Sequence, residues 1–217
     1  MSRENDHIDR RIACLQAERI PAALISTMGY HCEVWRSNLR LYRDGVPRTY
    51  DLVIKVPRET YSVQEASLLR RDYRRLRERL GSIIPRTQFV VTEIDGQSSV
   101  FAISEAVSRW FDIANPAHEE EAVPLFRKLR LARADLMRFV EAADAWDTHE
   151  NRVIDLYGLE NMVLDRAHRL RYLDSFRVFF YADMLHAIDG EDETLRQRIE
   201  LSRLRRDYLR FLVEASR

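Results

Sequence analysis

The segment DLYGLENMVLDRAHRLRYLDSF contains two short apolar runs, residues 162–164 and 170–173, separated by a polar turn. Asn161 stands directly before the first run and Asp174 directly after the second. An antiparallel pair brings the entry of one strand beside the exit of the other, so both side chains are expected at one end of a hairpin. An amide oxygen and a carboxylate there suit a hard divalent cation such as Mg²⁺. The alternative is that Asn161 and Asp174 only flank turns, as these residue types often do.

A second chemical candidate is Lys55, which lies in the apolar run DLVIKVP. Of the 35 basic residues, only Lys55 and Lys128 are lysines. A buried ammonium group is costly unless it is paired, and Glu65 in the next helical segment is a candidate partner. A strand Lys that contacts a nucleotide phosphate and is held by a helix carboxylate is a known arrangement. The alternative is a solvent-facing Lys that protects the edge of a sheet.

Length and composition are those of a globular chain of 217 residues, with 46% hydrophobic and 32% charged residues. The formal net charge is zero, so neither nucleic acid nor a membrane surface is expected as a partner. No apolar run approaches the roughly 18 residues of a membrane span. The N-terminal stretch MSRENDHIDRRIACLQ is too charged for a signal peptide. Cys14 and Cys32 have no metal-ligand spacing, and we expect free thiols and a cytoplasmic location.

The N-terminal half is expected to be mainly strands. The spacing of Ile8, Ile12 and Leu15 predicts a short amphipathic helix over residues 6–19. Runs rich in β-branched and aromatic residues then predict an antiparallel meander, with strands at 22–26, 32–36, 38–43 and 50–56. A long helix over 62–80 follows, with Gly81 as its C-cap. Two further strands are expected on either side of the turn sequence DGQ.

The C-terminal half is expected to be mainly helical. A helix is predicted over 119–146, then the hairpin, then helical structure through the last 40 residues. Because strands lead and helices trail, the chain is predicted to be α+β, with lobes at 1–107 and 108–217. The segment RLRRDYLRF alternates charge signs, which is more typical of a docking or homodimer helix than of a nucleic-acid-binding stripe.

In their order along the chain, these segments resemble the motifs of the protein kinase-like superfamily, in particular small bacterial kinase-like proteins of the YrbL type and aminoglycoside phosphotransferases. DLVIKV resembles the strand with the phosphate-binding Lys, and QEASLLRRDYRRLRERLGSIIPRTQFV resembles the helix with its Glu partner and the next strand. FAISEAV resembles the strand that leads to the adenine-binding hinge, DLYGLENMVLD the catalytic loop, and LRYLDSF the metal-binding Asp segment. The step of 13 residues from Asn161 to Asp174 also fits, and the resemblance covers residues 22–180.

The resemblance implies a bilobal protein kinase-like fold with a minimal helical C-terminal lobe. It implies a phosphotransferase that uses ATP and Mg²⁺ and acts on a protein or small-molecule hydroxyl. In that mechanism Asp155 accepts the hydroxyl proton, Asn161 and Asp174 bind Mg²⁺, and Lys55 binds the phosphates. Glu65 would hold Lys55, with Asp72 on the same helix as the other candidate. The remaining nucleotide contacts implied by the resemblance are Gly29, Val34, Glu105 and Val107.

Several departures from the family pattern keep a second function open. In TMGYHCEV, Thr27 and Cys32 replace two glycines of the nucleotide loop, which keeps Gly29. Asp155 precedes Asn161 by six residues, one more than is common, so that Asp147 is the next carboxylate to consider as the base. The alternative function is therefore a pseudokinase, a regulatory module that binds a nucleotide or a partner.

Overall fold

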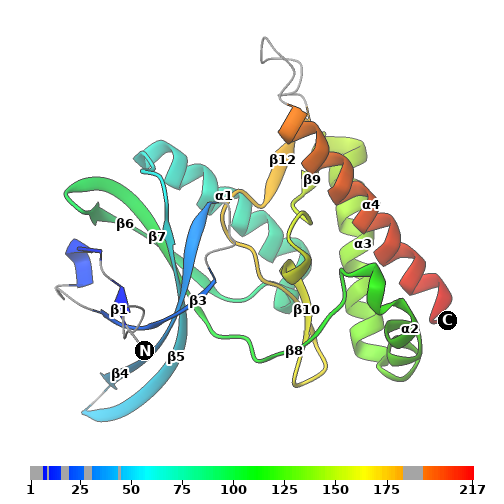
Figure 1. Ribbon diagram of the computed structural model, residues 1–217, viewed down its shortest axis with the longest axis horizontal. Coiled ribbons are helices and arrows are strands. Elements are labelled where there is room, and N and C mark those ends of the chain that lie inside the picture. The colour runs from blue at the N-terminus through cyan, green and yellow to red at the C-terminus, as the bar shows by residue number, and fades with distance from the viewer. Residues whose placement is uncertain (1–6, 9, 16–19, 27–30, 44, 183–192) are drawn as a thin grey trace. The chain divides into compact units, whose positions relative to one another are not determined.

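The computed structural model describes residues 7–8, 10–15, 20–26, 31–43, 45–182 and 193–217. Within these ranges the strands form antiparallel sheets and the longer helices lie mainly in the second half of the chain, which confirms the predicted α+β class (Figure 1). The chain divides into two compact units. The first contains residues 1–71 and 86–106, and the second contains 72–85 and 107–217, so that the division falls inside one long helix.

The first unit is built on a five-stranded antiparallel sheet in the order β3-β4-β5-β7-β6. Its strands are β3 (Ala23–Ser26), β4 (Cys32–Arg43), β5 (Val46–Pro57), β6 (Thr87–Ile94) and β7 (Gln97–Glu105). The two runs predicted at 32–36 and 38–43 form one continuous strand, β4, which pairs with β5 along its whole length. Asp95 and Gly96 join β6 to β7 with φ of 53° and 81°, as a two-residue hairpin turn requires, so the turn predicted at DGQ is confirmed.

An extended N-terminal segment, and not a helix, packs into the core of this unit. β1 (His7–Ile8) pairs with β2 (Ile20–Pro21), and the 3₁₀ helix η1 (Ala13–Leu15) lies between them. Ile8 and Ile12 are 0% and 1% exposed and belong to the core cluster of the sheet, whose other members are Ala22, Trp35, Ile54, Val56, Ile94 and Phe101.

The helix predicted over 6–19 is therefore wrong for the described residues 7–8 and 10–15, which form a strand and a 3₁₀ helix, while residues 6, 9 and 16–19 lie outside the described part of the chain. Ile12 forms a β-bridge with Ile94, and the Arg11 N–H donates to Asp95 Oδ1 at 2.9 Å. The four-residue spacing of Ile8 and Ile12 fits a helix stripe, but burial against the sheet and bonds to the β6–β7 turn outweigh that local preference.

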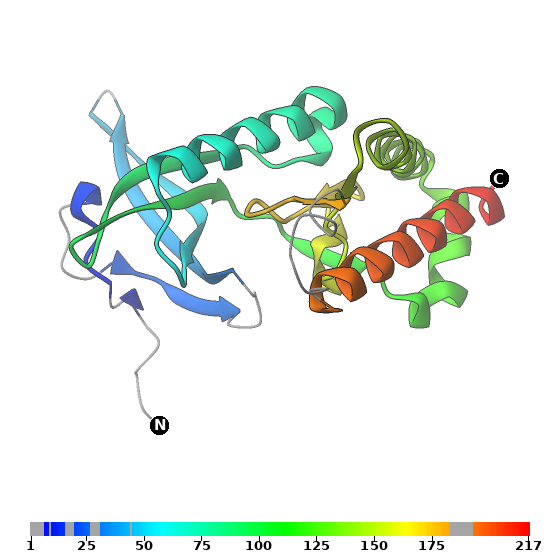
Figure 2. The same cartoon turned by 90° about the horizontal axis from the view of Figure 1, so that it is seen from above.

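Helix α1 (Val63–Leu80) follows the prediction closely. It begins with a capping box, in which the Glu65 N–H donates to Ser62 Oγ at 3.2 Å and the Ser62 N–H donates to Glu65 Oε2 at 2.8 Å. It ends at Gly81, whose φ of 59° is the left-handed conformation expected of a C-cap glycine. In the first unit, Arg70 donates to the Phe89 carbonyl of β6 at 2.5 Å and so connects the first half of α1 to the sheet. The ribbon of α1 is seen along its length in Figure 2.

The second unit combines small sheets with helices. Its strands are β8 (Arg109–Asp112), β9 (Arg152–Ile154), β10 (Met162–Asp165), β11 (Leu170–Tyr172) and β12 (Phe179–Tyr181), arranged as β11-β10-β8 and β12-β9. Its helices are α2 (Glu119–Lys128), α3 (Arg130–Glu150) and α4 (Glu193–Ala215). Figure 1 shows α3 and α4 side by side, and Asp147 of α3 accepts hydrogen bonds from Arg203 and Arg206 of α4.

Three predictions for this unit need correction. The single helix predicted over 119–146 is interrupted at Leu129, whose φ and ψ of −94° and 73° are not helical, so α2 and α3 are separate helices. Strands β8 and β9 were not predicted, because runs of four and three residues are too short to show a period. Continuous helix through the last 40 residues is wrong at β12, which pairs with β9, while residues 183–192 lie outside the described part of the chain.

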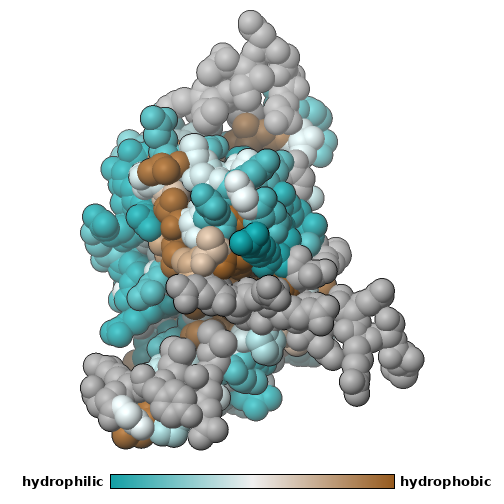
Figure 3. All heavy atoms as spheres, turned by 90° about the vertical axis from the view of Figure 1, so that its left-hand side faces the viewer, coloured by the Kyte–Doolittle hydropathy of each residue, from teal (hydrophilic) through white to brown (hydrophobic). Residues whose placement is uncertain are grey.

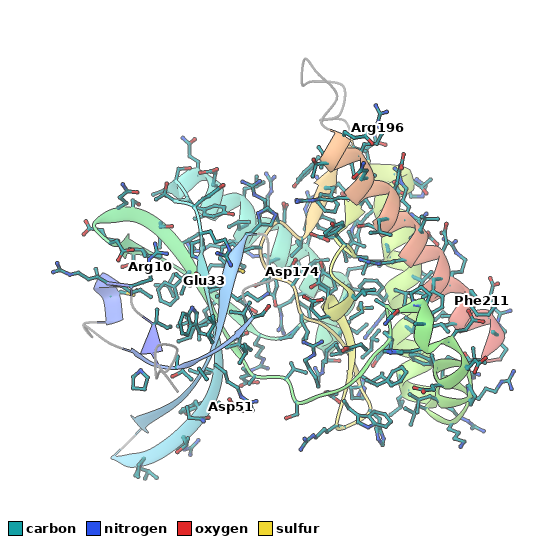
Figure 4. The ribbon with its side chains drawn as sticks, in the orientation of Figure 1. Arg10, Glu33, Asp51, Asp174, Arg196 and Phe211 are labelled. Atoms are coloured by element: carbon teal, nitrogen blue, oxygen red, sulfur yellow. The ribbon has the colours of Figure 1, made fainter. Side chains whose placement is uncertain are left out.

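One face of the molecule can be described by its hydropathy. Hydrophilic groups predominate on the face shown in Figure 3, with apolar groups nearer its middle. Exposed apolar residues are spread over several elements and include Ile25, Val46, Leu131, Leu204 and Phe211. In α4, for which a docking role stays a prediction, the exposed Phe211 is labelled in Figure 4. None of the helices in the described ranges is both long enough and apolar enough to cross a membrane.

Candidate functional site

The predicted hairpin is confirmed. Asn161 directly precedes its first strand and Asp174 follows shortly after its second strand, so the two residues lie at the same end of the hairpin. β10 pairs with β11 so that Met162 lies opposite Tyr172. One step further out, the Leu173 N–H donates to the Asn161 carbonyl at 2.8 Å. Asp174 therefore follows directly after the residue that is hydrogen-bonded to Asn161. Whether this pair binds a metal stays a prediction.

Asp155 is held in a fixed loop directly after β9. Its N–H donates to the Val178 carbonyl at 2.9 Å, and its own carbonyl accepts a hydrogen bond from the Tyr172 hydroxyl at 2.8 Å. Its carboxylate Oδ1 accepts the Tyr157 N–H at 2.8 Å, and the residue is only 8% exposed. The Val178 carbonyl and the Tyr172 hydroxyl thus fix the main chain of Asp155, and the Asx-type turn to the Tyr157 N–H fixes its side chain.

The electrostatic environment of Asp155 is unusual for a carboxylate. Burial, and then the nearby charge of Asp174, raise the pKa of Asp155 to about 7, against the opposing hydrogen bond from the Tyr157 N–H and the charges of Arg198 and Arg205. A carboxyl group with a pKa near neutrality is well suited to accept and release a proton. The charge of Asp174 thus contributes to the raised pKa of Asp155.

Tyr172 and Asp174 are fixed by their surroundings as well. Burial, followed by the charges of Asp174 and Asp155, raises the pKa of Tyr172 well above its ordinary value, so its hydroxyl stays protonated and keeps donating to the Asp155 carbonyl. Asp174 Oδ1 accepts the N–H groups of Ser175 and Phe176 at 2.7 and 3.3 Å. These bonds orient the Asp174 carboxylate at the end of the hairpin, where Figure 4 labels it.

The donor atoms at this end of the hairpin fit a hard cation. Asn161 supplies an amide oxygen and Asp174 a carboxylate, which are ligands that Mg²⁺ accepts in proteins. In the described ranges no three His, Cys, Asp or Glu side chains gather into a metal-binding group.

Lys55 lies in the centre of the first unit's sheet. β5 has β4 on one side and β7 on the other, and Lys55 is directly opposite Val34 and Ala102. Side chains alternate along a strand, so Lys55 is on the opposite face from Ile54 and Val56, which belong to the apolar core cluster. The alternative of an edge-strand Lys is therefore wrong. The nucleotide-binding role of Lys55 stays a prediction.

The two candidate partners of Lys55 have different surroundings. The exposed Glu65 lies in the first turn of α1, where its Oε2 accepts hydrogen bonds from both the N–H and the Oγ of Ser62 at 2.8 Å. Asp72 is 6% exposed and belongs to the second unit, where it accepts a hydrogen bond from the Tyr181 hydroxyl at 2.6 Å. Each carboxylate thus has a structural role of its own.

The other predicted nucleotide contacts are spread over the first unit and its C-terminal border. Gly29 lies outside the described residues, as does Thr27. Val34 is on β4 beside Lys55. Glu105 is the last residue of β7 and is exposed. Val107, two residues later, is partly buried and begins the stretch 107–217 of the second unit.

Asp147, the alternative base, belongs to an ion-pair network between α3 and α4. It accepts hydrogen bonds from Arg203 at 2.7 and 2.9 Å and from Arg206 at 2.6 Å. Burial alone would raise the pKa of Asp147, but the hydrogen bonds and charges of Arg203 and Arg206 outweigh it and hold the pKa below its ordinary value. Asp147 is thus an ionised structural partner of α4, and this environment does not suit a group that must take up a proton.

Sequence reasoning missed the residues of α4 that hold the loop after Asp155. The Leu156 N–H donates to Ser202 Oγ at 3.2 Å, and Arg205 donates to the carbonyls of Leu156 and Tyr157. In the sequence, the charge alternation around Arg205 indicates only a docking surface. Nothing in the spacing of these residues connects them to a loop nearly 50 positions earlier, so the contact could be found only from the structure.

No protein-family model matches this chain, and no curated protein is significantly similar to it in sequence. Function is therefore inferred from the residues and their geometry.

Proposed function

We propose that this protein is an ATP- and Mg²⁺-dependent, kinase-like phosphotransferase that acts on a hydroxyl group of a protein or small molecule. The observation that carries the proposal is the buried carboxylate of Asp155, which the Tyr157 N–H holds in place and whose pKa is raised to about 7, with Asn161 and Asp174 at one end of the neighbouring hairpin. The position of Lys55 on the central strand of an antiparallel sheet, opposite Val34, also supports it. The corresponding architecture would be a bilobal kinase-like fold with a minimal helical C-terminal lobe.

Asp155 is the proposed general base. Its pKa of about 7 allows it to be ionised at neutral pH and to take the proton of an acceptor hydroxyl that comes within hydrogen-bond reach. The Tyr157 N–H fixes the carboxylate, and Tyr172 fixes the backbone beneath it. The base is thus held in place before substrate binds, so little reorganisation is needed during proton transfer.

Asn161 and Asp174 are the proposed ligands of Mg²⁺, which when bound neutralises charge on the transferring phosphoryl group. Lys55 would bind the phosphates of ATP, held by Glu65 or Asp72. Gly29, Val34, Glu105 and Val107 complete the proposed nucleotide contacts.

A pseudokinase is the second candidate function, and one observation favours it. Asp155 is 8% exposed, and its Oδ1 is already bonded to the Tyr157 N–H. Arg205 further fastens this loop to α4 through the Leu156 carbonyl at 2.6 Å. A carboxylate so enclosed has limited access to an acceptor, which suits a module that binds a nucleotide or partner without turnover.

Binding is tested first by following the unfolding temperature during titration with ATP, with and without Mg²⁺. A ligand that binds only the folded state raises its stability by about 2.7 kcal/mol at a hundredfold excess over Kd. We expect a shift with ATP that grows when Mg²⁺ is added. No shift at millimolar ATP under either condition would reject both the phosphotransferase and a nucleotide-binding pseudokinase.

Asp174→Asn should abolish the Mg²⁺-dependent part of this shift, because the substitution removes the negative charge that attracts the cation. The apo variant should stay folded, since the Asn Oδ1 can still accept the N–H groups of Ser175 and Phe176. The measurement is the ATP titration at several Mg²⁺ concentrations. A Mg²⁺ response equal to that of the wild type would remove Asp174 from the metal site.

Lys55→Met should weaken ATP binding by about tenfold or more while the apo protein keeps its fold. Met retains the apolar stem of Lys but lacks the ammonium group that would contact the phosphates. Isothermal titration with ATP measures the change. Lys128→Met is the matched control, because it removes the other lysine of the chain, which lies at the end of α2. Equal ATP affinity in both variants would mean that Lys55 does not contact the nucleotide.

A further inference from the structure

Gly158 lies three residues before Asn161, and its backbone conformation does not require a glycine. Its φ and ψ are −76° and 123°, an extended conformation that any L-residue adopts. Glycine is usually needed where φ is positive or where another group approaches the backbone closely. Since the first reason does not apply at Gly158, the second should.

A group does approach closely, and it is the side chain of Asn161. A Cβ atom added to Gly158 would lie 3.0 Å from both Cγ and Oδ1 of Asn161 and 3.1 Å from its Nδ2. These distances are at the lower limit of contacts between real side chains. The Asn161 amide therefore occupies the space that a side chain at position 158 would fill.

The backbone of Asn161 has little freedom to move away. Its N–H donates to the Gly158 carbonyl at 3.1 Å, within the short 3₁₀ helix η4 (Leu159–Asn161), and its carbonyl accepts the Leu173 N–H at 2.8 Å. The next residue, Met162, is fully buried and paired with Tyr172 in the hairpin. A Cβ at position 158 would thus be accommodated mainly by rotation of the Asn161 side chain.

We propose that Gly158 is a positioning residue that seats the amide of Asn161 at the end of the hairpin as a ligand for Mg²⁺. The metal part of this inference rests on the proposed function. The packing part does not, because it concerns only the contact between Gly158 and Asn161.

The packing part is tested by a double-variant cycle on the apo protein. Gly158→Ala should lower the unfolding temperature when residue 161 is Asn, because the new methyl group meets the amide. In the Asn161→Ala background the space is open, and the same substitution should raise the unfolding temperature, since Ala restricts the unfolded chain at a compatible backbone conformation. An equal effect of Gly158→Ala in both backgrounds would overturn the contact as the reason for glycine.

The metal part is tested by titrating Mg²⁺ at fixed ATP and following the unfolding temperature. Gly158→Ala should raise the Mg²⁺ concentration at half-response by about 10- to 100-fold, as is typical when a residue that orients a ligand is changed. Gly96→Ala is the matched control. It strains a turn with a φ of 81° in the other unit, so it should lower stability without changing the Mg²⁺ response.

The outcomes separate the two proposals. A wild-type Mg²⁺ response that Gly158→Ala leaves unchanged overturns the positioning role alone. A wild-type protein with no Mg²⁺ response overturns the proposed Mg²⁺-dependent function and the metal role of Gly158 together, while the double-variant cycle still decides the packing. If Gly158→Ala does not fold by itself, Gly158→Ala combined with Asn161→Ala should fold, and failure of that double variant contradicts the inference.

Discussion

Asp155→Asn should reduce phosphoryl transfer, and ATP hydrolysis without an acceptor, by about 10²–10⁴-fold while ATP binding persists. The substitution preserves the shape of the side chain and its bond from the Tyr157 N–H, but it removes the group that takes up the proton. The rate is measured as phosphate released from ATP at saturating Mg²⁺, and binding is measured separately by titration.

Asp147→Asn is the control for this variant. It also removes a carboxylate from the second unit, but one that is ion-paired to Arg203 and Arg206, so turnover should stay within a few-fold of the wild type. If turnover is kept in Asp155→Asn and lost in Asp147→Asn, then Asp147, and not Asp155, is the general base. A wild-type protein that binds ATP but shows no turnover would favour the pseudokinase.

The second large effect concerns stability and pH in the absence of Mg²⁺. Asp155→Asn should stabilise the apo protein at pH 8, by up to about 4 kcal/mol, and should have little effect near pH 4. The reason is that the folded protein disfavours the charged form of Asp155, whose pKa rises from an ordinary 3.8 to about 7. Denaturant unfolding of both proteins between pH 4 and pH 8 measures the difference.

The sign follows from the direction of the shift. Well below pH 3.8 Asp155 is protonated in both the folded and unfolded states and gives no difference. Between about pH 4 and pH 7 the unfolded state ionises first, so stability is lost progressively as the pH rises, and above pH 7 the loss is complete. Asn has no charge to bury, so the variant escapes this loss.

Asp147→Asn should show the opposite sign. The pKa of Asp147 is lowered in the folded state, so its contribution to stability is present above the ordinary pKa and is lost as the pH falls through the lowered value. The variant should therefore be less stable than the wild type at pH 8, and the difference should shrink in acid. Two Asp→Asn variants with the same sign at pH 8 would contradict the environments described for these carboxylates.

Local sequence signals determined the positions of those helices and hairpins whose caps and turns are formed by residues close together in the sequence. The capping box at Ser62 and Glu65 and the C-cap Gly81 define both ends of α1. The turn at Asp95 and Gly96 defines the β6–β7 hairpin. Two short apolar runs around a polar turn likewise predict the β10–β11 hairpin, so the adjacency of Asn161 and Asp174 could be predicted from the sequence pattern alone.

Elements that depend on distant partners could not be predicted in this way. Ile8 and Ile12 have a helix-like spacing but are buried in extended chain against the first unit's sheet. β12 exists because it pairs with β9, which lies 25 to 29 positions earlier, and three residues carry no period of their own. In each case, burial and pairing with a distant segment outweigh a weak local preference.

In the candidate site, too, some features are visible in the sequence and others depend on the tertiary structure. The residue types and the spacing of Asp155, Asn161 and Asp174 were visible in the sequence, as was the apolar strand around Lys55. The tertiary structure alone decided that Lys55 lies on a central strand, that Asp147 is an ion-paired structural residue, and that Asp155 is buried with its pKa raised. A sequence can specify which groups titrate, but the pKa of each group depends on burial and on nearby charges, and folding brings those charges from remote positions.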